Sequence, residues 1–221
     1  MAITVNTNIA SLNAQRNLNQ SGNSLQASLQ RLSSGLRVNS AKDDAAGLAI
    51  SQTLTSAIRG NNQAIKNAND GISVGQTAEG ALGQIANNMQ RIREIAVQAS
   101  NGSVSNTNRS QLQNEVDQLT QEISRIVQTT QFNGTSLLSG GSVLTFQVGS
   151  SGATTNQVSI SSTDLTSGGI LNTYNSSLTN TGTVSVTTQN GASGALSSLD
   201  ADIAQISNIR STFGAVQNRF D

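Results

Sequence analysis

The chain has 221 residues and a formal net charge of zero, from twelve basic and twelve acidic side chains. It contains no cysteine or histidine, which excludes a disulfide framework, a thiol nucleophile, a Ser-His-Asp triad and an imidazole-ligated metal site. The balanced charge argues against nucleic acid as the main partner. Only 35% of the residues are hydrophobic, with four phenylalanines, one tyrosine and no tryptophan, so we expect no thick globular core.

Long helices are expected, and a membrane span is not. The chain contains no proline, the residue that most often interrupts a helix. No stretch approaches the roughly 18 consecutive apolar residues that cross a bilayer, so we expect no membrane insertion. The first residues also lack the positive start and apolar run of a secretory signal. If the protein leaves the cell, we expect export without a cleaved signal peptide.

Residues 3–36 predict a helix with a narrow apolar stripe. Its leucines recur at the alternating spacing of four and three residues that marks a coiled-coil seam. An ordinary surface helix is the alternative, but so narrow a stripe favours a partner helix. We therefore expect residues 1–36 to be disordered in an isolated monomer. We expect the helix to form a subunit or coiled-coil interface through Leu18, Leu25, Leu29, Leu32 and Leu36.

A short polar segment separates this helix from the next one. We interpret it as a hinge, formed by Asn39, Ser40, Asp43 and Asp44. The two aspartates precede an alanine-rich stretch, where a carboxylate can accept hydrogen bonds from the amides at a helix start. Both are therefore predicted to cap the second helix.

The longest periodic segment covers residues 45–99 and predicts that second helix. If helical throughout, it would be ~80 Å long at 1.5 Å per residue. One seam phase ends at Ile72 and another begins at Leu82, with a slip between them near Gly75. The segment contains six glycines, each of which costs about 1 kcal/mol relative to alanine inside a helix. We therefore expect close packing against neighbouring helices to hold it together.

Two further helices are predicted after a break at residues 101–103. The first carries a clean seam, and its short connection to the second helix predicts antiparallel packing. Its Glu122 and Arg125 are expected to form an exposed ion pair. The last helix is expected to run from about Ala192 to the end. The predicted core of this helical rod comprises Leu82, Ile85, Met89, Ile92, Leu112, Val116, Leu119, Ile123, Ile203, Ile206 and Phe213.

The sequence changes character after residues 132–134, where short apolar runs are separated by Gly, Asn and Ser. The runs 143–148, 157–160 and 183–186 alternate apolar and polar residues, which predicts hairpins or a small β subdomain. The region is almost free of charge, so we expect a small insertion rather than an independent domain. The predicted fold is mainly α: a long antiparallel helical rod or coiled-coil bundle with a small β-rich insertion.

Candidate catalytic groups are few. The carboxylate pairs are Asp43 with Asp44 and Asp200 with Asp202, and we place both pairs near helix starts, where capping explains them. No phosphate-binding or dinucleotide-binding fingerprint is present. We therefore expect a protein that is not an enzyme and has no cofactor or metal. Its function is expected to be interaction, with copies of itself in particular.

Several blocks of the sequence match one family closely, above all residues 29–47, which read LQRLSSGLRVNSAKDDAAG. The other blocks are residues 3–8, 11–15, 67–73, 76–82, 91–98, 130–134 and 214–220. In these blocks, which are spread over residues 1–135 and the last thirty, the chain resembles bacterial flagellin. The resemblance implies a subunit of the extracellular flagellar filament, with a structural function in swimming motility.

The resemblance also implies a domain organisation and partners. Residues 1–44 would form the coiled-coil segment and hinge of the inner filament core, residues 45–135 with 192–221 the wall domain, and residues 136–191 a short variable part that faces outwards. Other flagellin subunits, the flagellar export apparatus and the filament cap would be its partners. Flagellins continue beyond residue 221 with a helix that pairs with residues 3–36, so we expect a fragment or a member whose partner helix comes from elsewhere.

Flagellins are also sensed by an innate Toll-like receptor through the wall domain. The matching positions in this chain are Arg91, Ile95 and Glu115, and the alternative for all three is ordinary helix surface. Two other functions stay open at this point. One is the flagellin-like hook–filament junction protein, and the other is a soluble carbohydrate-binding module that would use Tyr174 and Phe146 of the insertion for sugar stacking.

Overall fold

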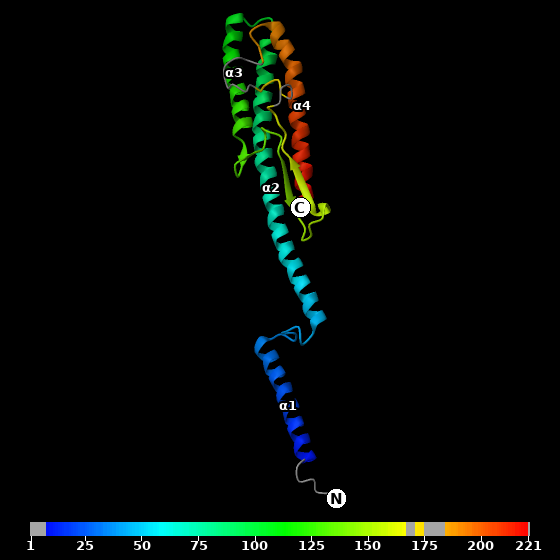
Figure 1. Ribbon diagram of the computed structural model, residues 1–221. Coiled ribbons are helices and arrows are strands. Elements are labelled where there is room, and N and C mark those ends of the chain that lie inside the picture. Colours follow the sequence, from blue (N-terminus) through cyan, green and yellow to red (C-terminus); the bar gives the residue numbers. More distant parts are fainter. Residues whose placement is uncertain (1–7, 167–170, 175–183, 221) are drawn as a thin grey trace. The chain divides into compact units, whose positions relative to one another are not determined.

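The computed structural model describes residues 8–166, 171–174 and 184–220 (Figure 1). The chain divides into two compact units, of which the first ends at Ile58 and the second begins at Arg59. Helix α2, Ala45–Ala99, contributes to both units. The described residues are mainly helical, with two small antiparallel hairpins. This arrangement confirms the predicted fold class.

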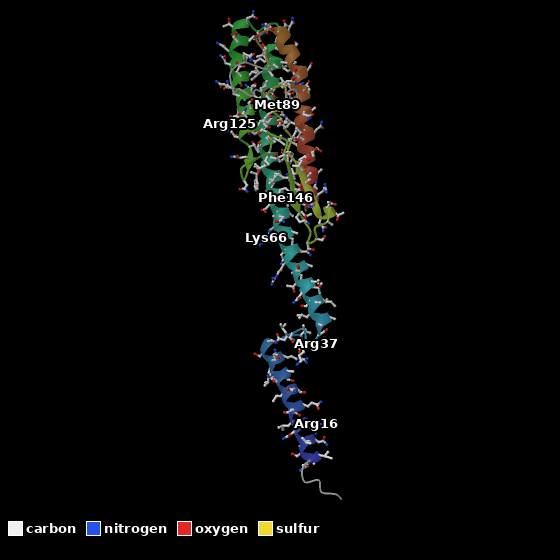
Figure 2. The ribbon with its side chains drawn as sticks, in the orientation of Figure 1. Arg16, Arg37, Lys66, Met89, Arg125 and Phe146 are labelled. Carbon is white, nitrogen blue, oxygen red and sulfur yellow. The ribbon has the colours of Figure 1, made fainter. Side chains whose placement is uncertain are left out.

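The first unit contains helix α1, Ile9–Ser34, a polar loop and the first turns of α2. The Asn8 side chain accepts a hydrogen bond from the Ser11 amide over 3.2 Å and so caps α1. The helix is followed by Gly35, whose φ of 67° lies in the left-handed region that favours glycine. No residue of α1 is buried. Figure 2 shows its side chains, Arg16 among them, extending outwards from the helix.

The second unit is a helical bundle in which α2 lies between α3, Asn106–Thr129, and α4, Gln189–Phe220 (Figure 1). The buried faces of the three helices belong to one hydrophobic cluster. Among the predicted core residues, the buried ones are Leu82, Ile85, Met89, Ile92, Val116, Ile123, Ile206 and Phe213. Those at the edge of the cluster, partly buried, are Leu112, Leu119 and Ile203.

A buried arginine closes the turn between α2 and α3. The Arg109 side chain donates to the backbone oxygen of Ala99 over 2.8 Å and to that of Asn101 over 2.9 Å. A third bond of 3.0 Å goes to the side chain of Asn106. These backbone oxygens lie at the end of α2, where the helix dipole favours a positive charge. Arg109 therefore caps α2, a function that the sequence analysis did not assign to it.

Two of the glycines in α2 permit a close approach of α4. A Cβ atom at Gly71 would lie 2.6 Å from the Phe220 ring, and one at Gly75 would lie 2.9 Å from the Gln217 side chain. No side chain fits at such distances, which confirms the expected close packing at these two positions. The expectation is wrong for Gly80 and Gly83, where a Cβ atom would meet nothing within 4 Å.

A tight hairpin follows α3. Strands β1, Gln131–Phe132, and β2, Thr135–Ser136, pair antiparallel. The two residues between them, Asn133 with φ 47° and Gly134 with φ 80°, both lie in the left-handed region. This is the backbone that a two-residue hairpin turn needs and that Asn-Gly adopts readily.

The longer hairpin consists of β3, Val143–Gln147, and β4, Gln157–Ser161, joined through the 3-10 turn η1, Thr154–Asn156. The strands pair antiparallel, with Thr145 opposite Ser159. Strand β4 alternates buried and exposed residues, so one of its faces is in the core. The strands predicted at 143–148 and 157–160 are thereby confirmed.

The third predicted strand, 183–186, is wrong where it can be checked. Thr183 lies outside the described residues, and Val184, Ser185 and Val186 do not belong to a strand. The side chain of Gln113 in α3 takes the place of a neighbouring strand, since it donates to the Val184 oxygen over 3.0 Å and accepts from the Val186 amide over 2.6 Å. The alternation of apolar and polar residues does not show whether the backbone of a segment bonds to a neighbouring strand or to a side chain.

The region between α3 and α4 contributes to the same core as the helices. Its apolar residues are buried together with the faces of α2, α3 and α4 in one cluster, through Leu137, Leu138, Ile160, Leu165, Leu171, Val184 and Val186. Much of the sequence between residues 136 and 191 therefore packs on the bundle as part of the second unit.

Candidate interaction surfaces

The leucine stripe of α1 is solvent-exposed in the first unit. The exposed fractions of the seam side chains are 76% for Leu18, 61% for Leu25, 56% for Leu29, 81% for Leu32 and 59% for Leu36. The first part of α2 in the same unit also exposes Ile50, Leu54 and Ile58. Full burial of each such side chain contributes about 1.5–3 kcal/mol. The first unit thus presents an apolar surface suited to another helix.

The predicted hinge residues form a network of hydrogen bonds in the loop before α2. The Asp44 carboxylate accepts from the Gly47 amide over 2.8 Å and caps α2, as predicted. Asp43 does not cap α2, so that part of the prediction is wrong. Its carboxylate turns back into the loop and accepts from the Ser40 hydroxyl over 3.0 Å and from the amides of Ser40 and Asn39 over 2.9 and 3.2 Å. These bonds, the Ser40 hydroxyl first, lower the pKa of Asp43.

Two of the three candidate receptor contacts form an exposed ion-pair cluster. Arg91 of α2 donates to Glu94 over 3.0 Å and to Glu115 of α3 over 2.9 Å. Glu115, the strongest of these contacts, followed by Glu94, raises the pKa of Arg91. The third candidate, Ile95, is only 1% exposed. It packs in the core because α2 is covered on two sides, so its side chain presents no surface to a receptor.

Other ion pairs lie on the surface of one helix or join two helices. Glu122 and Arg125 pair over 2.6 Å with both side chains about half exposed, which confirms the predicted surface pair. Arg210 of α4 pairs with Glu79 of α2 over 2.7 Å. Exposed pairs of this kind contribute little to stability, typically about 0–1 kcal/mol each.

The second carboxylate pair does not stand at a helix start. Asp200 and Asp202 lie well inside α4, because that helix begins at Gln189. Asp200 is exposed and bonds to Arg93 over 2.6 Å. Asp202 is 1% exposed and accepts hydrogen bonds from the Asn172 and Thr173 amides. The prediction of capping is therefore wrong for both residues.

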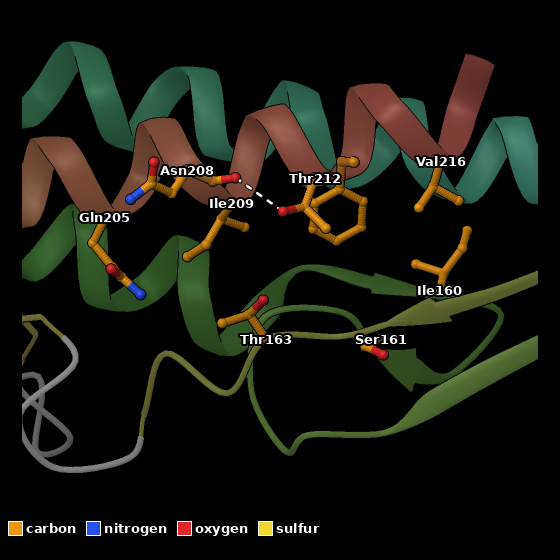
Figure 3. A pocket seen from close by; sticks show the side chains of 9 residues that line it. Ile160, Ser161, Thr163, Gln205, Asn208, Ile209, Thr212 and Val216 are labelled. Atoms are coloured by element: carbon orange, nitrogen blue, oxygen red, sulfur yellow. Dashed lines mark hydrogen bonds between the residues drawn. The ribbon is translucent and has the colours of Figure 1, made fainter. Parts of the chain in front are cut away.

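A shallow groove of about 270 Å³ lies between α4 and strand β4 (Figure 3). Its apolar wall comes from Ile160, Ile209, Phe213 and Val216, and Figure 3 shows Ile160 facing Val216. The Thr212 hydroxyl at its rim donates to the Asn208 backbone oxygen of its own helix over 3.0 Å. No charged side chain lines the groove, so its surface suits an apolar group better than an ionic ligand.

The two aromatic residues proposed for sugar stacking take part in different contacts. Phe146 packs edge to face on Phe220, with ring centroids 5.6 Å apart and an angle of 88° between the rings. The Tyr174 hydroxyl lies 3.3 Å from the side chain of Gln128, which donates to it. Phe146 is labelled in Figure 2, beside the bundle. Both side chains are partly buried.

In the part of the chain that the structure describes, His, Cys, Asp and Glu side chains do not gather in groups of three or more that could hold a metal ion. The described helices include none with both the length and the apolarity needed to span a bilayer.

Long helices and the exposed apolar stripe of α1 define a class of mainly helical protein with a helix face suited to another helix. Residues 5–142 match the family described as the bacterial flagellin N-terminal helical region. The chain belongs to the bacterial flagellin family, which confirms the resemblance found in the sequence.

Individual relatives agree with this assignment. The chain is 57% identical to the B-type flagellin of Pseudomonas aeruginosa over 161 residues, which cover 72% of this chain and 33% of that protein. It is 49% identical to the phase 1 flagellin of Salmonella naestved over 170 residues, or 77% of this chain and 34% of that protein. The chain thus spans about a third of the length of these curated relatives.

A solved structure shows the same fold. The crystal structure of Bacillus cereus flagellin superimposes with a TM-score of 0.60 at 30% sequence identity, and the match covers 71% of this chain and 85% of that one. The structure of FliC from Burkholderia pseudomallei gives a TM-score of 0.55 at 24% identity over 67% of this chain and 99% of that one, which supports the fold alone.

Proposed function

We propose that this chain polymerises, as a flagellin subunit, into the extracellular flagellar filament, with a mechanical rather than a catalytic function. The observation that carries the proposal is the exposed leucine stripe of α1, with side chains 56–81% exposed between Leu18 and Leu36. Such a stripe lowers the free energy only when another helix covers it. A subunit of a helical polymer supplies that helix in every neighbouring copy.

The predicted organisation fits this proposal. Residues 1–44 would line the inner core, residues 45–135 with 192–221 would form the wall, and residues 136–191 would lie towards the outside. The loop containing Asn39, Ser40, Asp43 and Asp44 would act as the hinge between the first two parts. The export apparatus and the filament cap are the further partners that we propose, with delivery to the filament that needs no cleaved signal.

Sedimentation with short filament fragments as seeds tests the proposed assembly. We expect the chain to pellet with the seeds, and the double variant Leu25→Glu with Leu32→Glu to stay in the supernatant, because two charges would be placed in the seam. The double variant Gln26→Glu with Gln30→Glu is the matched control, since both positions are exposed on α1 and the added charge is the same. Equal pelleting of the seam variant and its control would contradict the proposal.

We also propose that Arg91 and Glu115 contribute to recognition by an innate Toll-like receptor. Their ion pair presents an exposed guanidinium and carboxylate side by side on α2 and α3. Alanine substitution of either residue is expected to lower receptor signalling at least tenfold, the size of effect of a charged interface hot spot. Arg125→Ala, which breaks an equally exposed pair on α3, should leave signalling unchanged. A loss of signalling in the control as well would contradict a specific contact.

A further inference from the structure

Two short segments of the second unit are fastened to the helices by polar side chains, one by the buried Asp202 and the other by the partly buried Gln113. Residues 171–174, which we call strap 1, include the buried Leu171 and Thr173. Residues 184–186, which we call strap 2, include the buried Val184 and Val186. Neither segment is part of a strand in the structure, so their backbone groups need other partners.

Strap 1 is fastened to α4 by Asp202. One carboxylate oxygen accepts from the Asn172 amide over 3.0 Å and from the Asn172 side chain over 2.8 Å. The other oxygen accepts from the Thr173 amide over 2.9 Å. On the side of α3, the Gln128 side chain donates to the Tyr174 hydroxyl over 3.3 Å. Strap 1 is therefore bonded to helices on both sides.

Strap 2 is fastened to α3 by Gln113, whose side-chain amide bonds to both Val184 and Val186. The same amide nitrogen donates to the Asp117 carboxylate over 2.8 Å. This third bond orients the amide, because a carboxylate accepts only from the nitrogen and leaves the oxygen pointing at the Val186 amide. Asp117 therefore acts as a positioning residue for Gln113.

The two carboxylates behind these contacts are buried without a cation. Asp202 is 1% exposed and Asp117 is 7% exposed. Neither forms an ion pair with a lysine or arginine among the described residues. A buried carboxylate needs N–H donors in place of water, and for Asp202 strap 1 supplies them. The strap and the carboxylate thus depend on each other.

We propose that Asp202 and Gln113 are two independent latches. Each holds its own strap against the bundle, and loss of one latch opens only that strap while α2, α3 and α4 stay folded. Opening strap 1 exposes Leu171, and opening strap 2 exposes Val184 and Val186. The latches are carried by different helices and share no hydrogen-bond partner, which is why their opening is expected to be separate.

Hydrogen exchange at single backbone amides of the chain tests the latches. In Asp202→Asn, one carboxylate oxygen is replaced by an NH₂ group that faces a donor, so exchange at Asn172 and Thr173 should be at least about tenfold faster. Exchange at Val186 should not change. In Gln113→Met, the pattern should be the reverse. Asp200→Asn is the matched control, because Asp200 is an exposed aspartate of the same helix, and it should alter neither strap.

Two results would overturn the proposal. One is unchanged exchange within the strap whose latch was removed, and the other is faster exchange of both straps in either variant. If Asp202→Asn loses helical circular dichroism, Asn172→Ala replaces it, since this change removes only the 2.8 Å side-chain bond. Faster exchange at Thr173 in that variant supports the latch, and unchanged exchange there contradicts it.

Discussion

The two units of the chain carry the same kind of helical seam but place it in opposite surroundings. In α1 the seam leucines are exposed and the helix has no buried residue. In the second unit, Leu82, Ile85, Met89 and Ile92 of α2 are fully buried between two helices. Four-three spacing therefore specifies a face that can be covered, and the presence of a partner decides whether it is covered.

The largest expected effect is a difference in stability loss between one leucine substitution in each unit. Leu82→Ala should destabilise the second unit by about 2–5 kcal/mol, since the truncation leaves a cavity in the core. Leu29→Ala in α1 should change stability by less than about 0.5 kcal/mol, because that side chain is already exposed. Urea unfolding followed by circular dichroism measures both. A similar loss in the two variants would show that α1 is packed in the monomer.

The polar side chains that cap α2 and α1 also differ between the two units in their expected effect on stability. Arg109→Met should destabilise the second unit by about 1–3 kcal/mol, because three hydrogen bonds of this buried side chain are lost at the turn between α2 and α3. Asn8→Ala removes the exposed cap of α1 and should reduce helicity there without shifting the unfolding midpoint of the second unit. Thermal unfolding resolves the two. An unshifted midpoint in Arg109→Met would contradict the structural function of this arginine.

Glycine substitutions sharpen the comparison within α2. Gly71→Ala should destabilise the bundle by about 1 kcal/mol or more, because the methyl group would overlap the Phe220 ring. Gly80→Ala should instead stabilise the helix by about 0.5–1 kcal/mol, since a Cβ atom there meets nothing within 4 Å. Chemical unfolding of both variants gives the sign. Equal signs would show that α4 does not approach α2 closely at Gly71.

The smallest effect concerns the loop of the first unit. The pKa of Asp43 is lowered by its hydrogen bonds, so the loop order that these bonds provide is present above the unfolded pKa and is lost as the pH falls through the lower folded value. Exchange at the Asn39 and Ser40 amides, compared with the intrinsic rate at each pH, should lose protection in acid. Asp43→Asn should show weak protection at every pH. Acid-insensitive protection in the unaltered chain would contradict the assignment.

Periodicity was sufficient to predict the helices and most of the core. The seams of α2, α3 and α4 identified their buried faces because amphipathic spacing depends only on local sequence. The burial of Ile95 was not predicted, because α2 is covered on two sides and a single stripe does not reveal a second covered face. The strands predicted at 143–148 and 157–160 lie within one residue of those observed, since a hairpin brings neighbouring runs together.

The polar contacts could not be predicted in the same way. Gln113 bonds to residues about 70 positions later in the chain, and Asp202 bonds to residues about 30 positions earlier. The sequence around such a side chain does not distinguish it from an exposed polar side chain. Asp43 was misassigned for a related reason, because a carboxylate near a helix start can serve the loop behind it as well as the helix ahead.

Because the stripe of α1 is uncovered in a single chain, the order of that helix depends on contacts with other chains. A face that only another chain can cover gains stability with the concentration of chains, as any binding equilibrium does. At low concentration the stripe is exposed to water, and at high concentration other chains cover it. How many copies share the solution, as much as the sequence itself, therefore sets the state of this segment.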